Sequence, residues 1–239
     1  MVTTSTATQT GEPTPVSPVT DTWLVIPLYN EATVVREVIS QARKIFPYVV
    51  VVDDGSKDAS AQEAAAAGAV VVRHPVNLGQ GAALQTGFSY VLEKTNADYI
   101  VTFDADGQHS TTDAAAMVAA ARDEGLAVVL GSRFLEGPSP VGWLKRVVLR
   151  TAAAVSSHTS GMRLTDAHNG LRALNRKAAS SIEINQNRMA HASEITGEIA
   201  RHRLAYAEEP VYILYTDYSR AKGQSVWNMV NILSDLTFK

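Results

Sequence analysis

An alternation between residues 23 and 131 constrains the fold of this chain more than any other feature. Short apolar runs rich in Val are separated by stretches in which apolar residues recur every three or four positions. The runs are apolar on both faces, which is typical of parallel strands covered by helices on each side. The alternation therefore predicts an α/β fold, Rossmann-like, with a mostly parallel central sheet flanked by helices. Strands are expected at 23–28, 49–52, 70–72, 99–103 and 126–130.

The alternation of apolar runs with helical periodicity becomes less regular after residue 131, but no linker or repeat indicates a second domain. The sequence predicts one domain over 21–239, in which 23–131 form a nucleotide-binding half and 132–239 an acceptor-side half. Asn30 is expected to cap the first helix and Pro47 to end it. Further expected elements are a helix from about 80 to 92, strands at 170–174 and 211–215, and helices at 189–203 and 224–236.

Composition narrows the class of protein. Residues 1–20 are rich in Thr, Pro and Ser, which predicts a disordered tail and no secretory signal. A net charge of −3 gives no general attraction to nucleic acid, and without cysteine the chain has no disulfides or thiolate metal sites. No run approaches the roughly 18 apolar residues of a membrane span. We expect a cytoplasmic protein, soluble or peripheral on the cytoplasmic face of a membrane.

The end of the strand at 99–103 carries the clearest functional signal. Asp104, Asp106 and Gln108 alternate there, and in extended chain alternate residues point to the same side. Their hard oxygen atoms suit Mg²⁺ or Mn²⁺, which take one or two carboxylates together with substrate phosphate oxygens. Such an ion neutralises charge on a departing diphosphate. An isolated Asp-x-Asp also occurs in ordinary turns, so its place at a strand end matters.

The first two strand ends are candidates for holding a nucleoside. Pro27 closes its strand, Tyr29 offers a flat face for a base, and Glu31 can accept hydrogen bonds from ribose or base. Asp54 and Gly55 follow the second strand, where two adjacent carboxylates are costly unless they cap a helix or bind a ligand. A strand end followed by a helix cap is the simpler alternative at both places.

Gly79 belongs to a glycine-containing segment that opens a helix. The segment lacks the third glycine of the dinucleotide fingerprint, because Leu84 stands there, and no P-loop signature is present. We expect its glycines to allow close backbone approach beside the nucleotide.

Basic side chains supply a possible clamp for the diphosphate. Arg133 follows the strand at 126–130, and Arg220 and Lys222 lie in a late polar loop. Solvated surface charge is the alternative for each.

A hydroxyl acceptor would require a general base, whereas a phosphate acceptor is already ionised. Asp166 is the first candidate for a base or an acceptor-site residue, and Glu194 is the second; either can instead cap a helix or face solvent. Catalysis is thus assigned to Asp106, Asp166 and Arg133. His109 adjoins the metal loop, whereas the other histidines are interpreted as surface or core residues.

Together these segments resemble the family 2 glycosyltransferases of the GT-A fold, most closely the dolichol-phosphate mannosyltransferase-like, polyprenyl-phosphate branch. The resemblance spans about residues 23–235. Its motifs are VIPLYNE (25–31), VVDDGS (51–56), NLGQGAALQTGF (77–88), FDADGQH (103–109), GSRF (131–134), DAHNGLRAL (166–174), EEPV (208–211) and YSRAKGQS (218–225).

The resemblance implies an inverting transferase that takes a sugar from a UDP-, GDP- or dTDP-sugar donor. The motifs imply that the nucleoside is held by Pro27, Tyr29, Glu31 and Asp54. They imply that the metal and the diphosphate are held by Asp104, Asp106 and Gln108. They also imply that phosphates are bound by Arg133, Arg220 and Lys222. Two positions depart from the close relatives: Gly107 replaces a common leucine, and Gln80 replaces a common lysine. The C-terminal membrane helices of many relatives are not seen in this chain.

The acceptor is the least determined part. Residues 143–155 combine apolar and basic side chains, which suits a helix lying on an anionic bilayer, but a core-facing helix is the simpler interpretation. A polyprenyl phosphate in cell-envelope glycan or glycoprotein synthesis is the first hypothesis, and a glycan or soluble hydroxyl acceptor is the alternative. A nucleotidyltransferase and a non-catalytic nucleotide-sugar sensor also remain. The sequence leaves the oligomeric state open.

Overall fold

The computed structural model describes residues 17–135, 161–166, 169–188 and 190–214. Within these residues, seven strands form one sheet in the order β3-β2-β1-β4-β6-β5-β7. The strands are β1 (Thr22–Leu28), β2 (Tyr48–Asp53), β3 (Val70–Arg73), β4 (Tyr99–Thr102), β5 (Val128–Ser132), β6 (Arg172–Asn175) and β7 (Tyr206–Pro210). Four of the strand pairs are parallel and the two that involve β6 are antiparallel, so the predicted mostly parallel α/β fold is confirmed.

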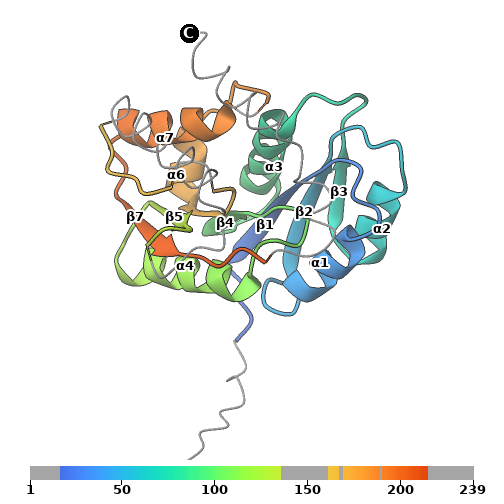
Figure 1. Ribbon diagram of the computed structural model, residues 1–239, viewed down its shortest axis with the longest axis horizontal. Helices are drawn as coiled ribbons and strands as arrows, with labels where there is room; N and C mark the ends of the chain where they lie inside the picture. Colours follow the sequence, from blue (N-terminus) through green and yellow to red (C-terminus); the bar gives the residue numbers. More distant parts are fainter. Residues whose placement is uncertain (1–16, 136–160, 167–168, 189, 215–239) are drawn as a thin grey trace, which may run out of the picture.

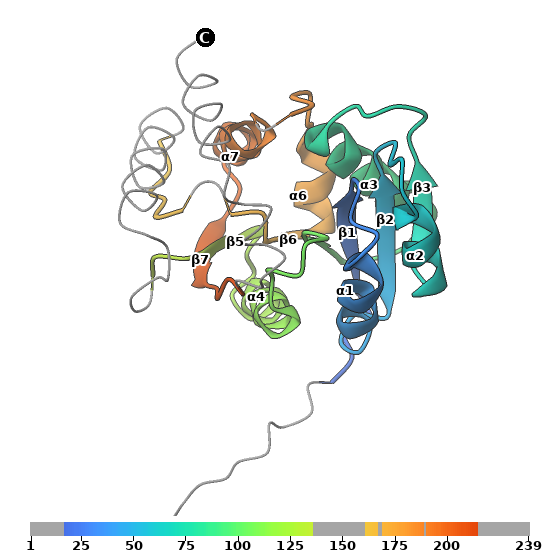
Figure 2. The ribbon, with the colours of Figure 1, turned by 45° about the vertical axis from the view of Figure 1, so that its right-hand side comes forward.

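Helices cover both faces of the sheet (Figures 1 and 2). One face packs against α1 (Val35–Ala42), α2 (Ser60–Ala66) and α4 (Thr111–Asp123), and the other against α3 (Gln80–Lys94), α6 (Arg176–Ser181) and α7 (His191–Arg201). The pleat of β1 divides its side chains between the two cores, with Leu24 and Ile26 on the first face and Val25 on the second. This three-layer arrangement leaves the carboxyl ends of β1, β2 and β4 at one edge.

Strand β6 is the feature that matters most for the site. It runs antiparallel to both β4 and β5, so that Arg172 lies opposite Thr102 on one side and Leu130 on the other. The strand predicted at 170–174 is therefore present but begins two residues later. The hydrophobic pattern locates such a strand without giving its direction, because direction depends on the connections.

Two predictions are wrong. The last strand in the described residues is β7 at Tyr206–Pro210, and not the strand predicted at 211–215. Its half-buried sequence YAEEP pairs with β5 through the backbone. Residues 211–214 form no strand, and Tyr215 lies outside the described residues. Asn30 does not cap α1, which begins at Val35. The φ of Asn30 is 54°, and the Asn30 side chain accepts a hydrogen bond from the Lys57 backbone N–H.

The remaining predicted elements have mixed outcomes. Helix α7 confirms the helix predicted at 189–203, and α3 confirms the one predicted from about residue 80. Helix α6 was missed; Asn175 caps it by accepting from the Ala178 N–H. The stretches at 143–155 and 224–236 and residues 1–16 of the predicted tail lie outside the described residues. Val19 already donates its backbone N–H to Ile45 and packs against the core. None of the helices in the described part of the chain has the length and apolar character of a membrane span.

Gly87 sets the contact between α3 and β1. A Cβ built there would lie 2.3 Å from Cγ1 of Val25, so any side chain forces the helix away from the strand. We expect Gly87→Ala to destabilise the protein by about 1–3 kcal/mol, as overpacking of a core does, measured by urea denaturation.

Gly197→Ala is the matched control, because Gly197 also lies inside a helix but its added Cβ meets no atom within 4 Å. It is expected to stabilise the protein by about 0.5–1 kcal/mol through helix propensity alone. Equal effects of the two substitutions would contradict the tight packing of α3 on β1.

Candidate active site

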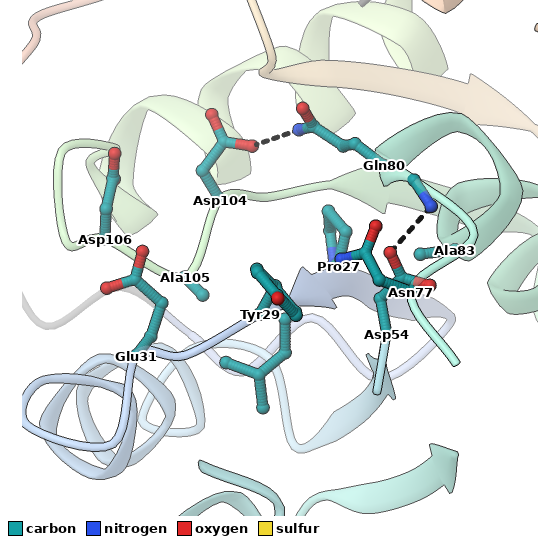
Figure 3. Close-up of a pocket in the computed structure, with 12 residues that line it drawn as sticks. Pro27, Tyr29, Glu31, Asp54, Asn77, Gln80, Ala83, Asp104, Ala105 and Asp106 are labelled. Carbon is teal, nitrogen blue, oxygen red and sulfur yellow. Dashed lines mark hydrogen bonds between the residues drawn. The ribbon is translucent and has the colours of Figure 1, made fainter. Parts of the chain in front are cut away.

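A cavity of about 360 Å³ opens at the carboxyl ends of β1, β2 and β4, beside the start of α3. Doubly wound sheets bind ligands at this edge. In Figure 3 the acidic side chains of Glu31, Asp104 and Asp106 stand on one flank, and Asp54 stands on the other with Tyr29 between. The described lining comprises Pro27, Leu28, Tyr29, Glu31, Asp54, Asn77, Gly79, Gln80, Ala83, Asp104, Ala105 and Asp106.

Asp104 stands at the cavity with its side chain 31% exposed. Its carboxylate accepts hydrogen bonds from Gln80 at 3.2 Å and pairs with Nε2 of His109 at 2.9 Å. Burial by itself raises the pKa of Asp104, but the neighbouring His109 and then Arg172 outweigh burial and bring the pKa below its ordinary value. Asp104 is therefore held as a carboxylate.

Asp106 has the opposite electrostatic environment. Burial, followed by the negative charges of Asp104 and Glu31, raises the pKa of Asp106 above its ordinary value. Strand β4 ends at Thr102, so the following residues form turns, with Gly107 at φ 74°, and not the extended chain that the sequence argument assumed. Asp104 and Asp106 still face one cavity, where they concentrate negative charge.

Gln108 is not among the described residues that line this cavity. Its backbone N–H donates to Asp106 at 3.0 Å, and its carbonyl accepts from the Leu214 N–H. The backbone N–H of Gln108 thus orients the Asp106 carboxylate. In the described part of the chain, no three His, Asp or Glu side chains form a preformed metal cage.

The flank opposite the acids is a rigid turn. Gly55 has φ 73°, and a Cβ there would lie 2.7 Å from the backbone of Val76. Gly79 has φ 107°, and its Cβ would lie 2.1 Å from the carbonyl oxygen of Asn187. Gly79 thus allows close approach of its backbone to the chain itself at Asn187, whereas the approach to a nucleotide predicted for its segment stays a prediction.

Arg133 is paired on the other side of the site. Its guanidinium makes two hydrogen bonds to the two oxygens of Asp166, at 2.6 and 2.7 Å. The side chain of Asp166 is 1% exposed and that of Arg133 is 13% exposed, so the pair is nearly dry. Glu208 fixes the backbone beneath it by accepting from the N–H groups of Thr165 and Asp166.

Arg172 is a site residue that the sequence argument missed. It is 2% exposed, and its buried Nη1 has no hydrogen-bond partner within the described part of the chain. Burial lowers the pKa of Arg172 to about 10, while Asp104 and Asp166 act in the opposite direction. Arg172 therefore places one positive charge between the carboxylates of the two flanking strand ends. The sequence feature that could have identified Arg172 as a site residue is an arginine inside a short predicted strand.

The four further residues that the sequence analysis considered have different outcomes. Glu194 accepts hydrogen bonds from the backbone N–H groups of Asn185 and Gln186, which gives it a structural partner. Arg220 and Lys222 lie outside the described residues. His74, interpreted from the sequence as a surface or core residue, is bonded to Asp54 and Thr86 at the edge of the site.

The fold and the site define a doubly wound α/β protein with an acidic cavity at its strand ends. The family model for glycosyl transferase family 2 matches residues 23–182. An uncharacterised protein of Methanocaldococcus jannaschii is 32% identical over 90% of both chains. This chain therefore belongs to glycosyl transferase family 2.

Named relatives and solved structures agree with that family. A UDP-N-acetylglucosamine–dolichyl-phosphate N-acetylglucosaminyltransferase of Methanococcus voltae is 29% identical and covers 85% of this chain and 90% of its own. Polyprenol monophosphomannose synthase of Mycolicibacterium smegmatis is 32% identical, covering 72% of this chain and 68% of its own. Glucosyl-3-phosphoglycerate synthase of Mycobacterium tuberculosis, crystallised with Mg²⁺ and UDP, shares the fold, with TM-score 0.66 and 20% identity over 87% of this chain and 75% of that one.

The buried Arg133–Asp166 pair generates a stability prediction. Asp166→Ala leaves the guanidinium of Arg133 without its carboxylate in a nearly dry site, and we expect a loss of about 3 kcal/mol in the free energy of unfolding, measured by denaturant titration.

Asp21→Ala is the control, because it breaks the solvent-exposed pair between Asp21 and Arg122. An exposed pair contributes about 1 kcal/mol or less. Equal losses in the two variants would contradict the view that Asp166 balances buried charge.

Proposed function

We propose that this chain is an inverting, metal-dependent glycosyltransferase that moves a sugar from a nucleotide diphosphate to a polyprenyl phosphate. The observation that carries the proposal is the cavity in which Asp104 and Asp106 face Tyr29 and Asp54. One flank supplies carboxylates, and the other supplies a flat ring and a backbone turn. A nucleoside diphosphate has complementary parts in the same order.

The donor is proposed to lie with its nucleoside near Pro27, Tyr29, Glu31 and Asp54, with Gly55 and Gly79 shaping the turn. The two solved structures of a fold neighbour with UDP, and the UDP-sugar named for the M. voltae relative, make uridine the first nucleotide to test. Asp54 already accepts two backbone hydrogen bonds, so its proposed contribution is to shape the pocket as well as to face the base.

The residues present fit Mg²⁺ or Mn²⁺. Burial, followed by repulsion from Asp104 and Glu31, raises the pKa of Asp106, and a divalent cation would relieve the repulsion. Two carboxylates without a preformed cage suit an ion that takes its other ligands from phosphate oxygens and water. Asp104 and Asp106 are the proposed ligands, with Gln108 orienting Asp106. The ion would supply charge neutralisation for the leaving diphosphate.

The acceptor is proposed to be a phosphate because Asp166 is poorly placed to remove a proton. Both of its oxygens accept hydrogen bonds from Arg133, so the carboxylate is committed to a buried ion pair. A polyprenyl phosphate is already ionised and requires no base. In the proposed step its oxygen attacks the anomeric carbon, the carbon–oxygen bond to the diphosphate breaks, and nucleoside diphosphate leaves. Asp166 would orient Arg133, and Arg133 would bind a phosphate.

Other support comes from relatives that are named as transferases or synthases of dolichyl-phosphate, polyprenol-phosphate or undecaprenyl-phosphate sugars. An acceptor of this kind requires contact with a bilayer, and we therefore propose a peripheral position on the cytoplasmic face of a membrane. Arg220 and Lys222 are proposed to complete the phosphate contacts. A soluble hydroxyl acceptor is the alternative that the experiment must separate.

The test supplies UDP-, GDP- and dTDP-sugars with Mn²⁺ and either a polyprenyl phosphate or the alcohol of the same chain length. We expect transfer to the phosphate only, and loss of transfer on chelation of the metal. Asp106→Asn should lower kcat by about 100-fold or more, because it removes electrostatic stabilisation of the leaving diphosphate.

Asp123→Asn, on the exposed end of α4, is the matched control and should leave turnover unchanged. Equal transfer to the alcohol would contradict the phosphate acceptor. Full activity of Asp106→Asn, or activity without metal, would contradict the proposed donor site.

A further inference from the structure

Asp54 joins the end of β2 to the segment that lines the cavity. Its Oδ1 accepts from the Leu78 N–H at 2.8 Å, and its Oδ2 accepts from the Gly79 N–H at 2.7 Å. The side chain of Asp54 is 4% exposed. These bonds hold the turn before α3 against the flank of the cavity where Asn77 and Gly79 are exposed to a ligand.

His74 fixes Asp54 from behind. Its Nδ1 lies 2.8 Å from Oδ1 of Asp54, and its Nε2 lies 2.9 Å from the hydroxyl of Thr86 on α3. The carboxylate has no hydrogen to give, so Nδ1 must carry the proton that joins the two groups. The imidazole is 8% exposed and therefore nearly immobile between strand and helix. It ties the end of β3 to both Asp54 and α3.

Neither His74 nor Thr86 is among the described residues that line the cavity, whereas Asp54, Asn77 and Gly79 all are. The histidine therefore acts on a ligand in the cavity indirectly, and Asp54 is its hydrogen-bond partner that lines the cavity. If His74 is removed, one oxygen of Asp54 loses a charge-assisted hydrogen bond in a buried place, and the carboxylate is free to turn away from the backbone groups that it orders.

We propose that His74 is a positioning residue for donor binding: it orients Asp54, which in turn sets the 77–79 wall of the nucleotide pocket. The inference rests on the proposed function, because it takes the cavity as the donor site. It assigns His74 an effect on nucleotide affinity and none on the metal ligands, which lie on the opposite flank.

The test compares wild type with His74→Leu, His74→Asn and Thr86→Val. Binding of UDP and GDP with Mn²⁺ is measured by calorimetry, and kcat is measured at saturating donor. His74→Leu should raise the Kd of the nucleotide about tenfold, because a buried hydrogen bond to a charged group is lost. Its kcat should stay within about twofold, since ground state and transition state lose the same binding.

His74→Asn distinguishes positioning from mere space filling. The Asn side-chain nitrogen can donate to Asp54 as Nδ1 does, so this variant should keep the Kd within about threefold of wild type. Thr86→Val should fall between the two variants, because it removes only the second contact of the imidazole. His202→Leu is the control and should bind as wild type does, because His202 is partly exposed and lies at the C-terminal end of α7.

The outcomes separate the two proposals. A wild-type protein that binds no nucleoside diphosphate overturns the proposed function. A wild-type protein that binds normally while His74→Leu binds equally well, with or without a lower melting temperature, overturns the role of His74. Loss of affinity in His74→Asn as large as in His74→Leu also overturns it, because donation to Asp54 would then not be the cause.

Discussion

The structure depends on how the negative charge of clustered carboxylates is balanced at one edge of the sheet. Asp104 and Asp106 follow a buried strand, and Asp166 is buried nearby with its charge. Isolated buried charges are expensive, so they persist only with compensating partners. His109 compensates Asp104 first, and Arg133 pairs with Asp166. Arg172 adds positive charge toward both carboxylates because antiparallel β6 is inserted between the strands that lead to Asp104 and to Arg133. Within the described residues, burial and the charges of Asp104 and Glu31 outweigh the effect of His109 on Asp106, so the pKa of Asp106 is raised.

Two parts of the site are built in different ways, and the difference suits their proposed tasks. On the proposed donor flank of the cavity, Asp54 accepts hydrogen bonds from the backbone N–H groups of a turn, and His74 holds Asp54 through a side-chain hydrogen bond. Arg133 and Asp166 are not among the described residues that line this cavity; their buried ion pair fixes a charge on the proposed acceptor side. In the proposed function, the shape of the turn suits a flat nucleoside, whereas the fixed guanidinium suits an anion.

The sequence predicted the parallel half of the sheet and most of the cavity, because strand ends in a doubly wound fold must meet at one edge. It could not give the direction of β6, which only the connections decide, so the position of Arg172 between two carboxylates was missed. Strand β7 was missed because YAEEP carries no apolar alternation and is held by backbone pairing with β5. His74 was overlooked because its partners Asp54 and Thr86 are 20 and 12 residues away in the chain. Gln108 was assigned by an extended-chain argument, but the chain turns after Thr102.

The central claim is that Asp104 and Asp106 together bind a divalent cation, which in turn binds the diphosphate of the donor. Crystals grown with Mn²⁺ and a nucleoside diphosphate, measured at the manganese absorption edge, test it most directly. The account predicts one anomalous peak in the cavity, bound by side-chain oxygens of Asp104 or Asp106 and by phosphate oxygens. A nucleotide bound with no peak at these carboxylates, or a peak only elsewhere on the protein, would contradict it.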